Sequence, residues 1–152
     1  MTEIFKILLT SGLTVFGGVL VYVTGQLISK IFIEPIHELI KAIGEVRFTL
    51  EFHAPVIHTP ISRNDENSKE VYVSLMRNSC NLLARLHTIL CYSCISRQSR
   101  GFLPSKQNIV DSAIQLRGLS TYVYETGDKA NESIDVVNKR VNKIKENLGF
   151  VD

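Results

Sequence analysis

The sequence predicts an all-α protein in which one N-terminal transmembrane helix continues into a small antiparallel helical bundle. Residues 7–29 carry no charged side chain and are bracketed by Lys6 and Lys30. Later segments repeat apolar residues at the helical spacing of three and four, and no segment alternates as a strand does. Proline and glycine separate these segments, as expected of loops between packed helices.

Residues 7–29 are long enough to span a bilayer, because about 1.5 Å per residue gives about 34 Å of helix. A buried core helix and a signal peptide are the alternatives. A signal peptide is disfavoured because the chain starts MTEIFK, without a basic region, and no small-x-small cleavage site follows. Residues 1–32 are therefore predicted to be an uncleaved membrane anchor, in contact with membrane lipid.

The charges on either side of residues 7–29 predict the orientation. Lys6 precedes this stretch, whereas Lys30, Lys41 and Arg47 follow it. The positive-inside rule then places the N-terminus outside and the C-terminal domain in the cytoplasm. The three cysteines, an odd number, agree with a reducing compartment. We expect a single-pass protein of the inner (cytoplasmic) membrane.

Residues 33–53 are predicted to form a juxtamembrane helix. Apolar residues recur there at helical spacing, at Ile33, Ile36, Ile40, Ile43 and Val46. Pro35 is expected either to kink this helix or to restart it as a first-turn proline. The segment is interpreted as a member of the soluble bundle, and an amphipathic helix on the membrane surface is the alternative.

Residues 54–68 are predicted to be a loop, because Pro55 and Pro60 disfavour a helix, and Asn67 or Ser68 is expected to cap the next helix. Residues 69–149 then form the rest of the bundle, with helices at 69–96, 106–124 and 129–148. The first of these has its expected core face at Tyr72, Leu75, Met76, Leu82, Leu83, Leu86, Ile89 and Leu90.

Capping residues mark the ends of the last two helices. Ser105 is expected to be the N-cap of helix 106–124, and Gly127 its C-terminal end. Asp128 can start helix 129–148, which Gly149 is expected to end. The inward residues are predicted to be Ile109, Val110, Ala113, Leu116, Val123, Ala130, Ile134, Val137, Val141, Ile144 and Leu148.

Small residues line one side of the predicted membrane helix. They are Ser11, Thr14, Gly18, Gly25 and Ser29. Because helices associate in lipid through close backbone approach, this face predicts contact with another helix, and a homo-oligomer is expected. The alternative is the ordinary glycine content of a membrane helix.

A second set of residues shares one face of the predicted helix 69–96. It consists of Cys80, Ala84, His87, Cys91 and Cys94. Packing as small apolar residues at the edge of the core is the main interpretation. Zinc binding would need a further ligand from His37, His53 or His58, and a redox pair at Cys91 and Cys94 lacks the strand context of thioredoxin-like motifs.

Basic residues form two groups, which are interpreted as solvated faces, with binding to anionic lipid headgroups as the alternative. They are Arg97, Arg100 and Lys106, and Lys139, Arg140, Lys143 and Lys145. The net charge of +2 is too small to indicate nucleic acid as the partner. No nucleophile with a base, paired carboxylates or phosphate loop is recognisable, so we expect no enzyme activity, cofactor or small-molecule substrate.

Two short motifs carry a resemblance to a known group of proteins. FIEPI at residues 32–36 directly follows the predicted membrane helix, and KAIGEV follows at residues 41–46. Together they resemble a group of small bacterial single-pass membrane proteins with a short helical cytoplasmic part. The resemblance implies a location and a fold, but no substrate and no catalytic residue.

Three functions agree with these features. The first is a membrane-anchored interaction or scaffold module at the cytoplasmic face, self-associating and bound to a protein partner. The second is an oligomerising membrane-perturbing effector, such as a toxin or phage-defence component. The third is a metal- or thiol-dependent enzyme centred on His87, Cys91 and Cys94.

Overall fold

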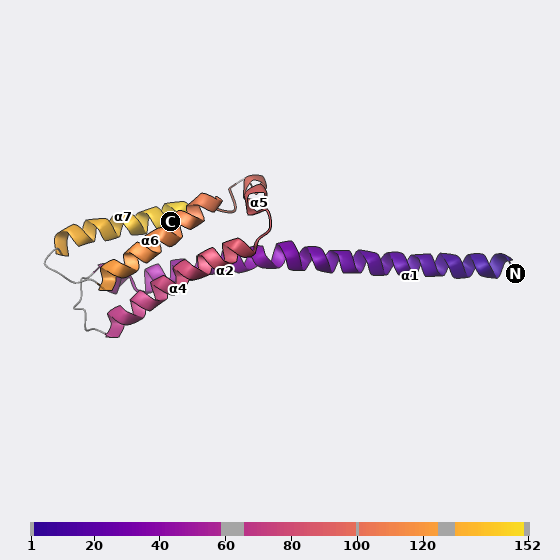
Figure 1. Ribbon diagram of the computed structural model, residues 1–152, viewed down its shortest axis with the longest axis horizontal. Coiled ribbons are helices and arrows are strands. Elements are labelled where there is room, and N and C mark those ends of the chain that lie inside the picture. Colours follow the sequence, from indigo (N-terminus) through magenta and orange to yellow (C-terminus); the bar gives the residue numbers. More distant parts are fainter. Residues whose placement is uncertain (1, 59–65, 100, 125–129, 151–152) are drawn as a thin grey trace.

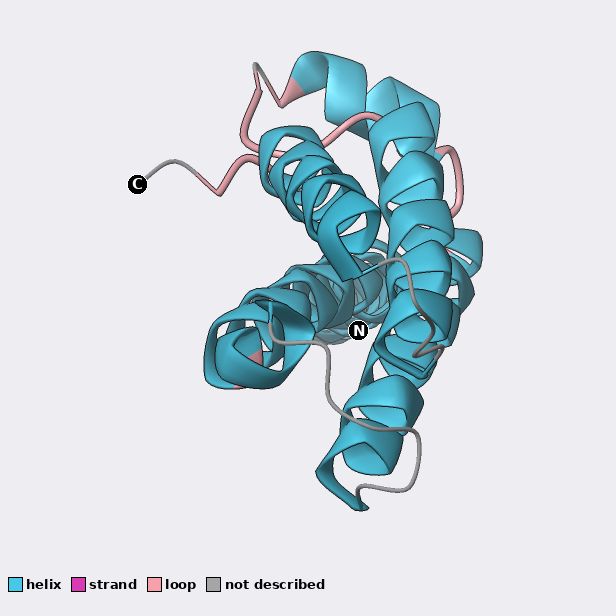
Figure 2. Ribbon diagram, turned by 90° about the vertical axis from the view of Figure 1, so that its left-hand side faces the viewer, coloured by secondary structure: helices cyan, strands magenta, loops and turns pink. Residues whose placement is uncertain are grey.

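The computed structural model describes residues 2–58, 66–99, 101–124 and 130–150, and every regular element in these ranges is helical. The elements are α1 (Thr2–Ile28), the π-helical turn η1 (Ser29–Ile33), α2 (Glu34–Phe52), α3 (Ala54–His58), α4 (Glu66–Thr88), α5 (Tyr92–Gln98), α6 (Lys106–Tyr124) and α7 (Ala130–Leu148). The predicted all-α fold is confirmed. α1 projects from one end of a helical bundle (Figure 1), and Figure 2 shows the bundle with the N-terminus behind it.

α4 and α6 form the centre of the bundle. α4 packs against α6 and α2, while α7 packs against α6. Two small, fully buried residues, Ser79 and Ala113, meet at the α4–α6 contact. The Ser79 hydroxyl donates a hydrogen bond to the Ala113 carbonyl oxygen at 2.8 Å. Side chains of this size let the two backbones come close, and the hydrogen bond satisfies a polar group that burial would otherwise penalise.

α2 is part of the bundle core as well as the continuation of α1. Leu39, Ala42, Val46 and Leu50 are buried on one side of it. Thr49, on the same side, accepts a 2.8 Å hydrogen bond at its hydroxyl oxygen from the Asn78 side-chain amide of α4. Both partners of this bond are only 7% exposed. The bond therefore ties α2 to α4 inside the core.

The buried face of α2 differs from the one that periodicity indicates. Of the five predicted apolar positions, Val46 is buried, Ile36 and Ile43 are partly buried, and Ile33 and Ile40 are exposed. α2 has apolar residues on more than one side, because Leu39, Ala42 and Leu50 offer a second set at helical spacing. Periodicity alone does not determine which set meets α4, and the buried face is the one that contains Leu39, Ala42, Val46 and Leu50.

The predicted loop at 54–68 is wrong at both ends. Ala54–His58 forms the short helix α3, and α4 begins at Glu66, so Asn67 and Ser68 lie inside its first turn rather than capping it. Pro55 is tolerated because first-turn amides need no partner within the helix. The buried side chain of Ile57 anchors α3 to the core. Pro60 lies outside the described residues.

The predicted continuous helix at 69–96 is also wrong, because the chain breaks between α4 and α5. Cys91 adopts a left-handed conformation with φ of 54°, and its carbonyl oxygen accepts the amides of Cys94 and Ile95. The break lets Tyr92 enter the core, where its hydroxyl donates a 2.6 Å hydrogen bond to the Pro104 carbonyl oxygen. Burial raises the pKa of Tyr92 to about 12. The predicted core residue Leu90 is instead exposed.

Two predicted helix ends are confirmed. The Ser105 hydroxyl oxygen accepts the Asn108 amide at 3.1 Å, which makes Ser105 the N-cap of α6. Gly149 has φ of 72°, and the amides of Gly149 and Phe150 bond to the carbonyls of Glu146 and Lys145. This pair of bonds is the Schellman ending of a helix, which requires a left-handed residue. Gly127 and Asp128 lie outside the described residues.

Candidate functional site: the apolar helix and its junction with the bundle

α1 has no buried side, although it is strongly apolar. Every large apolar side chain between Ile4 and Ile28 is at least 46% exposed. Within the described residues, one helix is long and apolar enough to cross a membrane, and it contains α1. A continuous apolar surface of this length is rare on a monomeric soluble protein and indicates a binding partner that is itself apolar.

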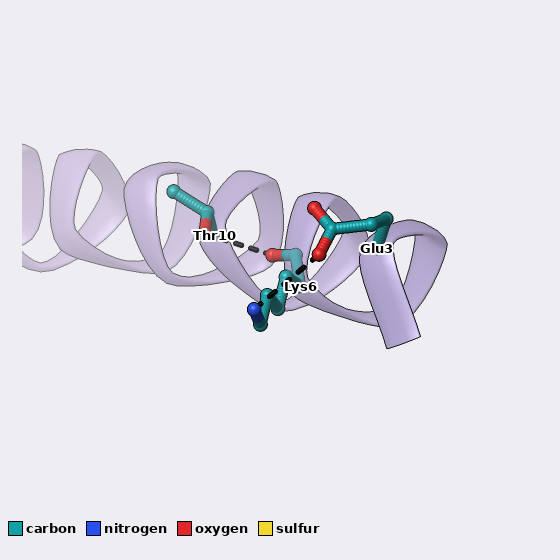
Figure 3. Close-up of polar contacts among 3 residues, drawn as sticks. All are labelled: Glu3, Lys6 and Thr10. Atoms are coloured by element: carbon teal, nitrogen blue, oxygen red, sulfur yellow. Dashed lines mark hydrogen bonds and ion pairs between the residues drawn. The ribbon is translucent and has the colours of Figure 1, made fainter. Parts of the chain in front are cut away.

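Three threonine hydroxyl groups of α1 are satisfied within the helix. Thr10, Thr14 and Thr24 each donate a hydrogen bond of 2.8 to 2.9 Å to the carbonyl oxygen four residues earlier. Figure 3 shows the Thr10 bond to the Lys6 carbonyl oxygen beside the 3.4 Å ion pair between Lys6 and Glu3. Because their hydroxyls already have acceptors, these threonines add little to the cost of placing α1 in lipid.

The predicted contact face of α1 is fully open. Its five residues are Ser11, Thr14, Gly18, Gly25 and Ser29, and each is exposed. A Cβ added at Gly18 or Gly25 would meet nothing within 4 Å. A second helix could therefore approach closely along this side.

A shallow open groove lies on a neighbouring side of α1 and shares only Ser11 with the predicted face. Its lining residues are Leu8, Ser11, Gly12, Val15, Phe16 and Val19. Gly12 is not part of the predicted face, because it lies about 100° around the helix from Ser11. A small residue flanked by large ones at positions four before and four after, here Leu8 and Phe16, is the signal that indicates such a hollow.

Pro35 lies in the first turn of α2, directly after the π-helical turn η1. In η1 the Glu34 amide bonds to the Ser29 carbonyl oxygen, five residues back rather than four. The extra residue widens the turn in front of the proline, whose ring would otherwise clash with the carbonyl four residues earlier. The ribbon passes without interruption from α1 through η1 into α2 (Figure 1), so the helix does not restart at the proline, and the predicted kink at Pro35 stays a prediction.

The cysteines and His87 do not form the predicted shared face. That face requires an unbroken helix, and the chain breaks at Cys91. Cys80, Cys91 and Cys94 are free thiols with exposed side chains, so their interpretation as packed core residues is wrong. Within the described ranges, no three His, Cys, Asp or Glu side chains gather into a group that could hold a metal ion.

One of the basic residues interpreted as solvated is wedged between α6 and α7. Arg140 donates a 2.7 Å hydrogen bond to the Gln115 side-chain oxygen, and its guanidinium lies 5.5 Å from the centre of the Tyr122 ring. Gly118 leaves the space for it, because a Cβ there would lie 2.7 Å from the central guanidinium carbon. Arg140 therefore contributes to packing rather than to a solvated face.

Comparison with known proteins finds no family model, curated protein or solved structure that matches the chain. The resemblance to small bacterial single-pass membrane proteins stays a prediction.

Proposed function

We propose that the chain is a membrane-anchored helical interaction module. α1 crosses the cytoplasmic membrane, and the bundle recruits or scaffolds a protein partner on the cytoplasmic side. The observation that carries this proposal is the exposure of α1, an apolar helix about 40 Å long with no covered side. Moving its side chains from water into lipid is favourable by on the order of tens of kcal/mol, far more than any other contact of the chain offers.

The join between α1 and the bundle supports a scaffold role. α2 continues from α1 through η1 and is buried in the core through Leu39 and Val46. The anchor and the bundle thus share a helical connection rather than a flexible linker. A module built this way keeps its surfaces close to the membrane, because the connection itself is helical.

Self-association and partner binding are assigned to different surfaces. Two copies are proposed to meet in the membrane through the face that contains Gly18 and Gly25. On the bundle, Phe48 and Phe52 stack with ring centres 5.3 Å apart, and each is 64% exposed on α2. Exposed aromatic pairs are typical of protein-binding surfaces, so we assign partner recruitment to this pair.

Cross-linking in native membranes with identification by mass spectrometry tests both surfaces. Gly18→Leu is expected to reduce the cross-linked dimer, whereas Gly17→Leu, the same change on a side rotated by about 100°, is expected to preserve it. The assigned face would be overturned if Gly18→Leu and Gly17→Leu reduced the cross-linked dimer equally. It would also be overturned if Gly12→Leu, in the neighbouring groove, removed the dimer while Gly18→Leu preserved it. A chain that is monomeric in native membranes would overturn self-association.

Partner recruitment is tested in the same membranes. Replacing Phe48 and Phe52 with alanine is expected to remove cross-links to the partner, and Val73→Ala on α4 is the matched control because Val73 is also exposed. Retention of every heterologous cross-link in the double alanine variant would contradict this assignment.

A further inference from the structure

The end of the bundle nearest α1 is formed by segments that are distant in the sequence. Glu38, near the start of α2, forms a 3.3 Å ion pair with Arg85 in the last turn of α4. The hydrogen bond from Tyr92 to Pro104 then holds α5 against the segment that leads into α6. The α4–α5 turn, α5 and the start of α6 therefore lie together beside the junction of α1 and α2 (Figure 1).

Two large apolar side chains at this end point away from the core. Leu90 is 60% exposed, and Phe102 is 78% exposed, more than any large apolar side chain of α1. The turn that carries Phe102 is held by hydrogen bonds, since its amide bonds to the Ser99 carbonyl oxygen and the next amide bonds to the Ser99 hydroxyl oxygen. Leu103, the next residue, is buried. The backbone thus fixes Leu103 inward and presents Phe102 outward.

The segment that carries these two side chains is basic in sequence. Residues 89–107 contain three basic residues and no Asp or Glu. Two of the three, Arg97 and Lys106, are exposed in the structure, and Arg100 lies outside the described residues. Exposed apolar side chains beside basic ones match the headgroup region of an anionic bilayer, which offers negative charge and apolar depth together.

We propose that residues 89–99 and 101–106 form a second membrane contact, which docks the bundle onto the anionic headgroups of the membrane that α1 crosses. Phe102 and Leu90 enter the interfacial region, while Arg97 and Lys106 lie near lipid phosphates. This inference rests on the proposed anchoring by α1. The anchor makes docking intramolecular, so contacts too weak to bind a free bundle suffice to orient a tethered one.

The experiment uses the full chain in nanodiscs and exploits its lack of tryptophan. Three single-tryptophan variants are compared: Phe102→Trp at the proposed contact, Phe16→Trp in α1, and Val73→Trp, which is exposed on the bundle. Each is measured with brominated lipids, which quench tryptophan at membrane depth, in anionic and in neutral discs. We expect quenching of Phe102→Trp in anionic discs, quenching of Phe16→Trp in both, and none of Val73→Trp.

The outcomes separate docking from anchoring. Unquenched Phe102→Trp with quenched Phe16→Trp would overturn docking and leave the anchor intact, while unquenched Phe16→Trp would overturn the proposed function. A blue-shifted but unquenched Phe102→Trp would indicate a protein contact and count against lipid. Arg97→Gln with Lys106→Gln is expected to lower the docked-to-undocked ratio about 30-fold, and equal quenching in neutral and anionic discs would contradict the electrostatic contribution.

Discussion

The buried hydrogen bond between Thr49 and Asn78 gives a quantitative test of whether α2 is held in the bundle core. Its donor and acceptor lie 2.8 Å apart and are nearly inaccessible to water. Thr49→Val removes the acceptor and leaves the buried Asn78 amide unpaired, which is expected to cost about 1–3 kcal/mol of unfolding free energy. Asn78→Leu should cost less, because the Thr49 hydroxyl can turn to a carbonyl of its own helix.

The double variant decides whether the two residues act as a pair. With both groups apolar, no buried polar group is left unpaired, so the loss should be smaller than the sum of the single losses by about 1–2 kcal/mol. The free energy of unfolding is measured for the unsubstituted chain, the two single variants and the double variant. All four are unfolded with urea as full chains in the same detergent, and unfolding is monitored by circular dichroism. Thr121→Val is the control, because Thr121 is exposed and bonds within its own helix.

Additive losses from Thr49→Val and Asn78→Leu would refute the reasoning, because residues in contact across an interface must show coupling. Such a result would mean that α2 does not pack against α4 as the structure has it. The amphipathic surface helix would then be the better interpretation of residues 33–53.

Three further predictions concern single positions. Leu39→Ala should lose about 2–5 kcal/mol of stability and Ile40→Ala much less, since Leu39 is fully buried and Ile40 is exposed; equal losses in urea unfolding would contradict the buried face of α2. Gly44→Ala should stabilise the chain by about 0.5–1 kcal/mol, because a Cβ there meets nothing, whereas Gly118→Ala should not stabilise it, because the Arg140 guanidinium must move; thermal unfolding compares the two. Burial raises the pKa of Tyr92 to about 12 in the folded state, so its contribution to the free energy of unfolding is complete below pH 10 and is lost as the pH rises to about 12. Tyr92→Phe should remove this fall in stability at high pH. An unchanged pH dependence of the unfolding midpoint in Tyr92→Phe would contradict the prediction.

Features specified by local chemistry could be predicted from the sequence. The helical fold follows from apolar spacing, and the ends at Ser105 and Gly149 follow from side-chain capping and from the left-handed backbone that glycine tolerates. The apolar length of α1 is likewise a property of one continuous segment. None of these features depends on a partner that is distant in the sequence.

Features that depend on distant partners could not be predicted from periodicity. The helix breaks at Cys91 without a glycine or proline at that position. The cost of the left-handed backbone there is offset by the burial of Tyr92 and by its hydrogen bond to Pro104. These contacts join residues from different segments, so the periodicity of one segment does not reveal them. The buried face of α2 depends in the same way on α4. In the sequence, Arg140 resembles the other basic residues of its segment, and only the structure shows its contacts with Gln115 and Tyr122.

For the candidate site, the small-residue face of α1 that the sequence predicts as a helix contact stays a prediction. The small-residue face of α1 is exposed, and the groove around Gly12 depends on the large neighbours Leu8 and Phe16 as much as on the glycine. The exposed Phe102 was missed because an isolated apolar residue in a loop has no periodic signal. Its position near α1 follows only from the packing of α4, α5 and α6.

Thiol labelling in intact bacterial cells tests the central claim, the crossing of the membrane by α1, most directly. Two variants with a single cysteine each are compared. In the first, Cys91 and Cys94 are changed to serine, so that Cys80 remains. In the second, all three native cysteines are changed to serine and Glu3→Cys supplies the thiol. Cys80 and Glu3 are both exposed in the structure, so each thiol can react if the reagent reaches it. With a membrane-impermeant maleimide, the account predicts labelling of Glu3→Cys in intact cells and of Cys80 only after lysis. Protection of both thiols, or labelling of Cys80 from outside, would contradict it.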